Sequence, residues 1–134
     1  MRLRIALLML GMAACAYAQT YVAEIPFRFH IGDQSYASGR YYFSERVSTA
    51  DPEMAWAMRS NETQRTVTFQ TISGRGPAQA PASRLVFHKY GATYFFSEVW
   101  AEGRPCREVS ASGNERTLAK NTSGDEVVAV SVAR

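Results

Sequence analysis

Apolar and polar side chains alternate with a period of two along much of the chain, which is typical of strands with one buried and one solvated face. The first such segment spans residues 21–31 and contains Pro26, which cannot donate to a β-ladder and so favours an edge position or a place near the strand start. The same alternation predicts strands at 40–47, 54–59 and 66–71. Apolar and aromatic runs predict strands at 84–89 and 93–101, a valine-rich run predicts one at 127–132, and residues 106–109 could form a short strand.

One short helix is expected near the C-terminus. Ser112 or Asn114 supplies a cap for a helix over 115–120, and Ser112 and Glu115 have the spacing of a capping box. Short strands connected by hairpins, with this single helix, predict an all-β fold: one antiparallel β-sandwich or small β-barrel of about seven or eight strands. Residues 73–83 are rich in Gly and Pro and are expected to form a mobile surface loop that proteases cleave easily.

The first 18 residues have the pattern of a signal peptide, so the working domain is expected to span 19–134. Arg2 and Arg4 precede an apolar run from Ile5 to Met12, and Ala16-Tyr17-Ala18 is a small-x-small cleavage site. The apolar run is shorter than the ~20 residues that a membrane-spanning helix needs, and no later segment approaches that length. We therefore expect export to the periplasm or the outside. A weaker alternative is a lipobox that ends in Cys15, in which Met12 stands where such signals usually place Leu.

Charge argues against nucleic acid as a partner. The whole chain has 15 basic and 12 acidic residues and a net charge of +3, and loss of Arg2 and Arg4 lowers this to +1 for the remaining 116 residues. The arginines are scattered singly, whereas phosphate binding needs basic side chains clustered on one face.

Removal of the signal peptide would leave Cys106 as a single cysteine, which excludes an intramolecular disulfide. We expect Cys106 to be a small buried hydrophobe, although pairing between chains or a role as a nucleophile is an alternative. A thiol enzyme would need a histidine and an orienting group beside it, and His88 and Glu98 supply those residue types without evidence that they converge. The sequence has no nucleophile elbow, phosphate-binding loop or zinc motif, so no cofactor and no metal are expected.

The two histidines have ordinary expected roles. His30 falls on the polar face of its strand, which predicts a solvated side chain. His88 lies on the opposite face of its strand from Phe87, and we expect its side chain to pair with Glu98 across the hairpin at Gly91.

Aromatic residues are too numerous for one narrow core face, because Tyr94, Phe95 and Phe96 are consecutive in a single strand. In a barrel the surplus could line a pocket for an apolar ligand, and in a sandwich it could form a binding patch. The alternative is that the helix and the long loop cover the second face. The candidate ligand-facing aromatics are Tyr42, Trp56, Tyr94, Phe96 and Trp100.

The stretch LVFHKYGATYFFSEVW at 85–100, together with ERTLAK at 115–120, resembles a family of short secreted bacterial proteins found in acidobacterial-type genomes. The segments PFRFHIG at 26–32 and SGRY at 38–41 are similar to two further motifs of that family. The resemblance covers most of the chain after the signal peptide and implies a small exported domain. It carries no established activity and therefore no functional residues. Cys106 stands where the family usually has Gly, so a thiol function common to the family is not implied.

These observations favour a secreted, non-enzymatic β-domain that acts as a binding or structural module of the cell envelope or periplasm. The partner would be an apolar ligand or an envelope protein. Two alternatives stay open: a thiol-dependent enzyme that uses Cys106, and a carrier of a small apolar ligand.

Overall fold

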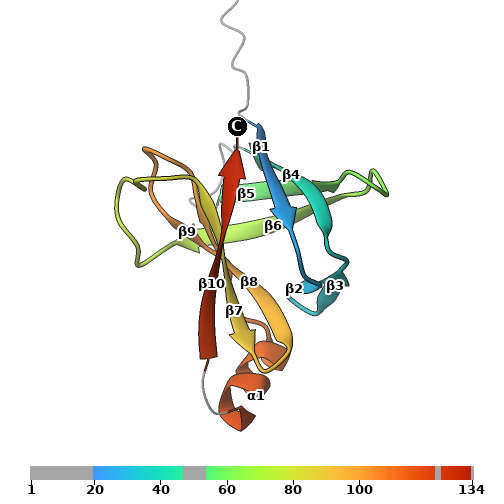
Figure 1. The fold of residues 1–134 in the computed structure, drawn as a ribbon. Coiled ribbons are helices and arrows are strands. Elements are labelled where there is room, and N and C mark those ends of the chain that lie inside the picture. The colour runs from blue at the N-terminus through green and yellow to red at the C-terminus, as the bar shows by residue number, and fades with distance from the viewer. Residues whose placement is uncertain (1–19, 47–53, 123–124, 134) are drawn as a thin grey trace, which may run out of the picture.

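The computed structural model describes residues 20–46, 54–122 and 125–133, and in these ranges the chain forms ten strands and one helix (Figure 1). The predicted signal peptide and Cys15 lie outside the described residues, as does Val47. The elements in order are β1 (Thr20–Ile25), β2 (Phe29–Ile31), β3 (Gln34–Tyr36), β4 (Gly39–Arg46), β5 (Met54–Ser60), β6 (Thr66–Ser73), β7 (Arg84–Tyr90), β8 (Thr93–Trp100), β9 (Arg107–Glu108), α1 (Gly113–Asn121) and β10 (Asp125–Ala133).

Eight of these strands close into a barrel, which settles the choice between sandwich and barrel. The order around it is β8-β7-β10-β1-β4-β5-β6-β9, and β9 pairs back onto β8. One edge of β8 is shared: Glu98 and Val99 pair with β9, whereas Tyr94 and Phe95 pair with the additional strand β2. The barrel pairings are antiparallel, and the β2–β8 contact is parallel. The hairpin of β2 and β3 therefore extends the sheet beyond the closed ring.

Aromatic rings fill the middle of the barrel. Phe96 lies 5.9 Å from Phe43, 5.3 Å from Phe69 and 5.3 Å from Phe87, measured between ring centroids. Phe29, which comes from β2, joins this cluster through Phe87 at 5.5 Å. Edge-to-face and offset stacking at these separations adds to the hydrophobic stabilisation of the core. The alternation predicted for β4 and β6 is confirmed by the buried inward residues Tyr41, Phe43, Phe69 and Thr71. In β5 the inward residues Trp56 and Met58 are buried, but Ala57 on the other face is buried too, at 3% exposed.

The segment expected as one strand at 21–31 is two strands. Pro26 ends β1, and the chain crosses through Phe27 and Arg28 before β2 begins. Phe27 stacks on Tyr94 with 3.8 Å between ring centroids, so the crossing itself is packed against the barrel. A proline lacks the N–H that a strand needs on its paired side, which explains the break.

The helix confirms its predicted cap. The Ser112 hydroxyl accepts a hydrogen bond from the Glu115 amide at 3.1 Å, and α1 then runs to Asn121. The helix lies beside the end of the barrel where the β7–β8 hairpin turns (Figure 1). It is the one helix in the described ranges, and it is not long and apolar enough to cross a membrane.

The loop at 74–83 is pinned to the barrel, contrary to the expectation of a mobile loop. The Gly74 amide donates to the Cys106 carbonyl at 3.1 Å, and the Ala80 amide donates to the Arg104 carbonyl at 2.9 Å. Ala80 is 3% exposed. The small residues that suggested mobility instead allow close packing, because a Cβ on Gly76 would stand 2.9 Å from the Cys106 sulfur.

Candidate functional site

The two ends of the barrel differ. At the end near β9, Arg107 is 8% exposed and its guanidinium donates to the Thr71 hydroxyl at 3.1 Å and to the Thr71 carbonyl at 2.8 Å. An ion pair between Arg104 and Glu45 lies across the same end. The cavity left there is only about 40 Å³, little more than the space of a single water in the liquid. This end is closed by side chains.

The opposite end, where β4 begins and β5 ends, holds a cavity of about 360 Å³. This volume falls in the range of small-molecule sites, which are common at the mouths of β-barrels. We call it the mouth cavity. Its lining comes from the β3 region, the start of β4 and the β5–β6 hairpin: Gln34, Ser35, Tyr36, Ala37, Ser38, Gly39, Tyr41, Met58, Ser60, Glu62, Thr63, Arg65 and Val67.

The inner wall of the mouth cavity is formed by side chains that belong mainly to the core. Met58 and Tyr41 are 1% and 4% exposed, so only a small part of each reaches the cavity, whereas Tyr36 is half-buried and offers more of its surface. Tyr41 packs edge-on against Phe29 at 5.3 Å, and Tyr36 stacks on Phe29 at 5.6 Å, which holds both tyrosine rings against the central cluster. A ligand here would contact a preformed surface, which lowers the ordering cost of binding.

Both tyrosines keep their protons at neutral pH. Burial raises the pKa of Tyr36, and burial together with the nearby charges of Glu62 and Tyr36 raises the pKa of Tyr41, against a lowering effect of Arg28. The Tyr41 hydroxyl donates to the Ala37 carbonyl at 2.5 Å, which leaves its oxygen available as an acceptor. The cavity therefore offers phenol groups and not phenolates for hydrogen bonding.

The rim is polar and carries both signs of charge. Glu62 and Arg65 line it from the β5–β6 hairpin, and both are exposed. Serine and threonine hydroxyls lie between them, such as that of Ser60, which accepts a hydrogen bond from the Thr63 amide at 3.3 Å. An apolar wall with a polar rim suits a ligand that has an apolar body and a polar group at one end.

The five aromatics predicted as ligand-facing do not come together. Trp56 and Phe96 are 2% and 3% exposed and belong to the packed interior. Tyr94 is half-buried and stacks on Phe27. The other two lie on the outside: the Trp100 ring is covered by the Arg84 guanidinium at 3.8 Å, and Tyr42 packs under Arg59 at 4.7 Å.

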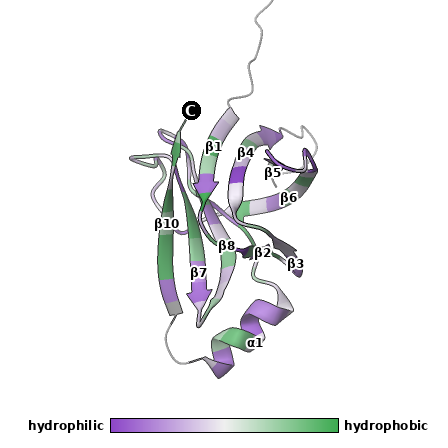
Figure 2. Cartoon of the chain, turned by 45° about the vertical axis from the view of Figure 1, so that its right-hand side comes forward, coloured by the Kyte–Doolittle hydropathy of each residue, from purple (hydrophilic) through white to green (hydrophobic). Residues whose placement is uncertain are grey.

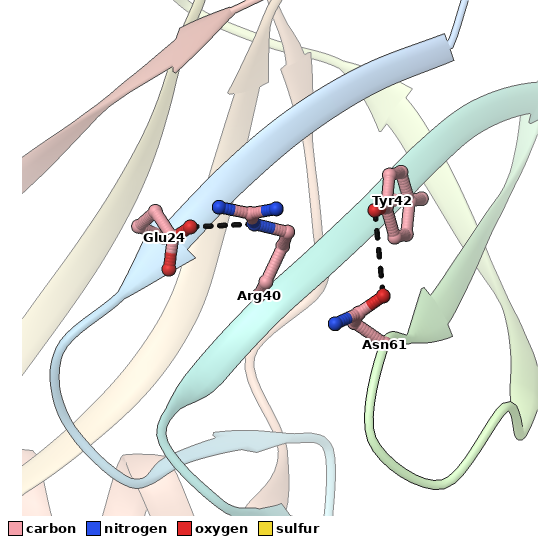
Figure 3. A network of polar contacts seen from close by, with 4 residues as sticks. All are labelled: Glu24, Arg40, Tyr42 and Asn61. Carbon is pink, nitrogen blue, oxygen red and sulfur yellow. Dashed lines mark hydrogen bonds and ion pairs between the residues drawn. The ribbon is translucent and has the colours of Figure 1, made fainter.

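Tyr42 lies on the outer face of β4. Its hydroxyl donates to the Asn61 side-chain oxygen at 3.4 Å, and it shares the outer surface with the Glu24–Arg40 pair (Figure 3). Tyr41, one position earlier, points inward to the mouth cavity. None of the five predicted aromatics lines that cavity, and their contact with a ligand stays a prediction.

Cys106 is a buried thiol held in its protonated form. It is 2% exposed, and its sulfur lies 3.7 Å from a Glu98 carboxylate oxygen. Burial, followed by the negative charge of Glu98, raises the pKa of Cys106 to about 11. A reactive cysteine needs the opposite surroundings, with a nearby cation that stabilises the thiolate.

His88 is not the partner of Glu98, so that predicted pair is wrong. A bulge between Val86 and Phe87 shifts the β7–β8 register and places His88 opposite Phe95, while Glu98 lies opposite Val86. The His88 Nδ1 lies 3.3 Å from the Tyr90 hydroxyl. Within the described chain, Cys106, His88 and Glu98 do not form a nucleophile and its base.

His30 is half-buried, so it is less exposed than the polar face of its strand predicts. Its ring stacks on Phe95 at 5.1 Å, and its Nδ1 is buried without a hydrogen-bond partner among the described residues.

Glu115 of α1 is 7% exposed, and burial raises its pKa, while the nearby charges of His88 and Arg116 lower it. In the described part of the chain, no three His, Cys, Asp or Glu side chains gather in a way that could hold a metal ion.

Comparisons with family models, with curated proteins and with solved structures find no match to this chain. The site must therefore be interpreted from its own residues. The sequence missed the mouth cavity because its lining comes from a turn and two hairpins that meet only after the barrel closes. The one local signal was Tyr36, a large aromatic in a segment otherwise composed of small and polar residues.

Proposed function

We propose that this chain is an exported, non-enzymatic binding domain of the cell envelope or periplasm, and that it holds a small ligand in the mouth cavity. The observation that carries the proposal is the cavity of about 360 Å³ with Tyr36, Tyr41 and Met58 on its wall. Such a ligand has an apolar or aromatic body against these side chains and a hydrogen-bonding group toward the serine and threonine hydroxyls of the rim.

The packed interior supports a ligand site at the end of the barrel and not in its centre. Phe29, Phe43 and Phe87 are 0% exposed and occupy the middle of the barrel, so a carrier with its ligand in the barrel centre has no support. A small apolar ligand would instead bind at the end of the barrel, in the mouth cavity. The thiol-dependent enzyme has less support, because the raised pKa of Cys106 favours the unreactive thiol.

The test is the binding of anilinonaphthalene sulfonate, a fluorescent probe with an apolar body and one anionic group. Val67 lines the cavity, and Val67→Trp would fill it, so probe affinity should fall at least about tenfold, a change of about 1.4 kcal/mol. Thr68→Trp is the matched control, because Thr68 is the next residue of β6 and is exposed. The affinity of Thr68→Trp for the probe should equal that of the wild type.

If Val67→Trp fails to fold, Ser38→Trp blocks the same cavity from an exposed turn position. Native mass spectrometry of protein purified from its own host then shows whether a small molecule copurifies and whether Ser38→Trp removes it. Equal probe binding by wild type, Val67→Trp and Ser38→Trp would exclude the mouth cavity as the binding site.

A further inference from the structure

One strand of the barrel has a free edge. Strand β10 pairs with β7 through seven residues, Asp125 to Ser131, but it pairs with β1 only at Val132 and Ala133. The two strands meet near the end of β10 and separate toward its start (Figure 1). Among the described residues, no strand pairs with the β1-facing side of β10 between 125 and 131.

Pairing between β1 and β10 already stops after Ala23 and Val132, before β1 ends at Ile25, and Pro26 prevents it from resuming further along. If the register of Val22 with Ala133 continued, Pro26 would lie opposite Ala129. That position requires a backbone N–H, which proline lacks. The barrel therefore has a seam between β1 and the first seven residues of β10.

The direction of the backbone groups along this edge follows from one hydrogen bond. The Val132 amide donates to the Ser83 carbonyl at 3.3 Å, which is the β7 side of the strand. The register with β7 is regular through β10, so successive residues alternate sides. The N–H and C=O groups of Val127, Ala129 and Ser131 consequently point into the seam, where no described strand pairs with them and an added extended backbone could do so.

Side chains at the seam are also incompletely covered. Val128 and Val130 face inward and pack against the core, yet both are only half-buried. Val127 on the outer face is 66% exposed. Exposed apolar strand edges are the usual sites of strand addition, and natural proteins commonly protect them with charges. Here Asp125 and Glu126 carry charge at the start of the free edge, whereas residues 127–131 carry none, and Figure 2 shows β10 hydrophobic along most of its length.

The edge can pair with a second copy of itself without opposing like charges. In an antiparallel pair of two β10 strands centred on Val128, Val127 lies opposite Ala129, Glu126 lies opposite Val130 and Asp125 lies opposite Ser131. No charged residue then lies opposite another charged residue. The centre is fixed because β1 already occupies 132 and 133, so the free residues 125–131 have their midpoint at Val128.

A groove at the end of the seam gives the second strand room. It measures about 370 Å³ and is lined by residues of β1, β4 and β10, among them Glu24, Arg40 and Ser131. Glu24 and Arg40 neutralise one another at 2.6 Å (Figure 3). The acidic start of a partner's β10 would therefore meet no net negative charge there.

We propose that this seam is an interaction surface for a second copy of the chain, which adds its own β10 in antiparallel fashion with the two-fold axis at Val128. The contact is short, so association is weak and depends on concentration. This inference is independent of the mouth cavity, since β10 contributes no residue to it.

The test is disulfide formation in two cysteine variants of the full exported protein. Val128→Cys would place two thiols directly opposite in the dimer, within the Cα separation that a disulfide allows. Val130→Cys is the matched control, because Val130 has the same facing and burial on the same strand but lies four residues from its copy. Mild oxidation should give a covalent dimer of Val128→Cys and none of Val130→Cys above the wild-type background from Cys106.

Sedimentation equilibrium tests the surface without a cysteine. Val127→Lys should weaken self-association at least about tenfold. Ile72→Lys should not change it, because Ile72, the other exposed large hydrophobic residue in the described ranges, pairs with Glu108, away from the seam. A wild-type chain that stays monomeric up to about 1 mM would overturn the proposal. Preferential crosslinking of Val130→Cys, or disruption by Ile72→Lys and not by Val127→Lys, would overturn it as well.

Discussion

Cys106 shows how burial can determine the chemistry of a single side chain. Its pKa rises from 9.0 to about 11 through burial and the charge of Glu98. At pH 8 this lowers the thiolate fraction about 100-fold relative to an unperturbed thiol. We therefore expect iodoacetamide to modify native Cys106 at least that much more slowly than the unfolded chain.

The charge of Glu98 can be tested separately. Glu98→Gln removes one cause of the raised pKa, so the pH profile of Cys106 alkylation should move to lower pH. Glu126→Gln, whose side chain is 72% exposed and lies on another strand, should leave the profile unchanged. Alkylation of the native protein at the unfolded rate would contradict the buried thiol.

Glu115 is a second residue whose pKa is raised by burial, and this raised pKa predicts that stability depends on pH. Its pKa is raised in the folded state, so the folded chain holds the proton to higher pH than the unfolded chain does. Its stabilising contribution is complete below the unfolded pKa and is lost as pH rises through the folded pKa. Glu115→Gln does not titrate, and should raise the melting temperature at pH 7 to 8 but have little effect at pH 3.

Thermal unfolding across this pH range measures the effect. The position of Glu115 in the first turn of α1 favours a negative charge by about 0.3–1 kcal/mol, which opposes the predicted gain. The net raised pKa indicates that burial outweighs this favourable term. A melting temperature of Glu115→Gln below that of wild type at pH 7 would contradict the prediction.

At the scale of elements, the loop at 74–83 is a packed strap and not a free connection. Gly76→Ala would place a Cβ 2.9 Å from the Cys106 sulfur and 3.4 Å from the Trp100 ring. Overpacking of this kind costs about 1–3 kcal/mol. We expect denaturant unfolding to show a loss in that range, and trypsin to cleave after Arg75 faster than in wild type.

Gly113→Ala is the control for this prediction. A Cβ at Gly113 meets no atom within 4 Å, and alanine favours a helix by up to about 1 kcal/mol over glycine. This variant should be as stable as wild type or more stable. Equal tryptic cleavage of wild type and Gly76→Ala at Arg75 would show that the strap is loose.

At the scale of the whole molecule, β8 joins the closed ring of the barrel to the hairpin beside the proposed ligand site. Its shared edge closes the barrel through β9 and holds the β2–β3 hairpin, which supplies one wall of the mouth cavity. At β8 the barrel closes through pairing with β9, whereas between β10 and β1 most of the edge of β10 is unpaired in the described residues. The two proposed surfaces, one for a small ligand and one for a second copy, thus arise at the two places where the barrel departs from a plain ring.

Local pattern by itself determined which side chains point inward, where most strands lie and how α1 begins. Alternation in β4, β5 and β6 predicts the buried faces because neighbouring residues of a strand must face opposite ways. Ser112 predicts the helix start because its hydroxyl satisfies a free amide of the first turn. These features depend on residues a few positions apart.

Only the tertiary structure decided which strands meet. The bulge in the β7–β8 pair, the pinned strap over Cys106, the mouth cavity and the seam at β10 all depend on pairing between distant segments. Alternation within β4 already predicts that Tyr41 and not Tyr42 faces inward, but only the meeting of β3, the start of β4 and the β5–β6 hairpin makes Tyr41 part of a cavity wall. Sequence alternation fixes the facing within each strand, but the free energy of the closed barrel selects the register and the partners.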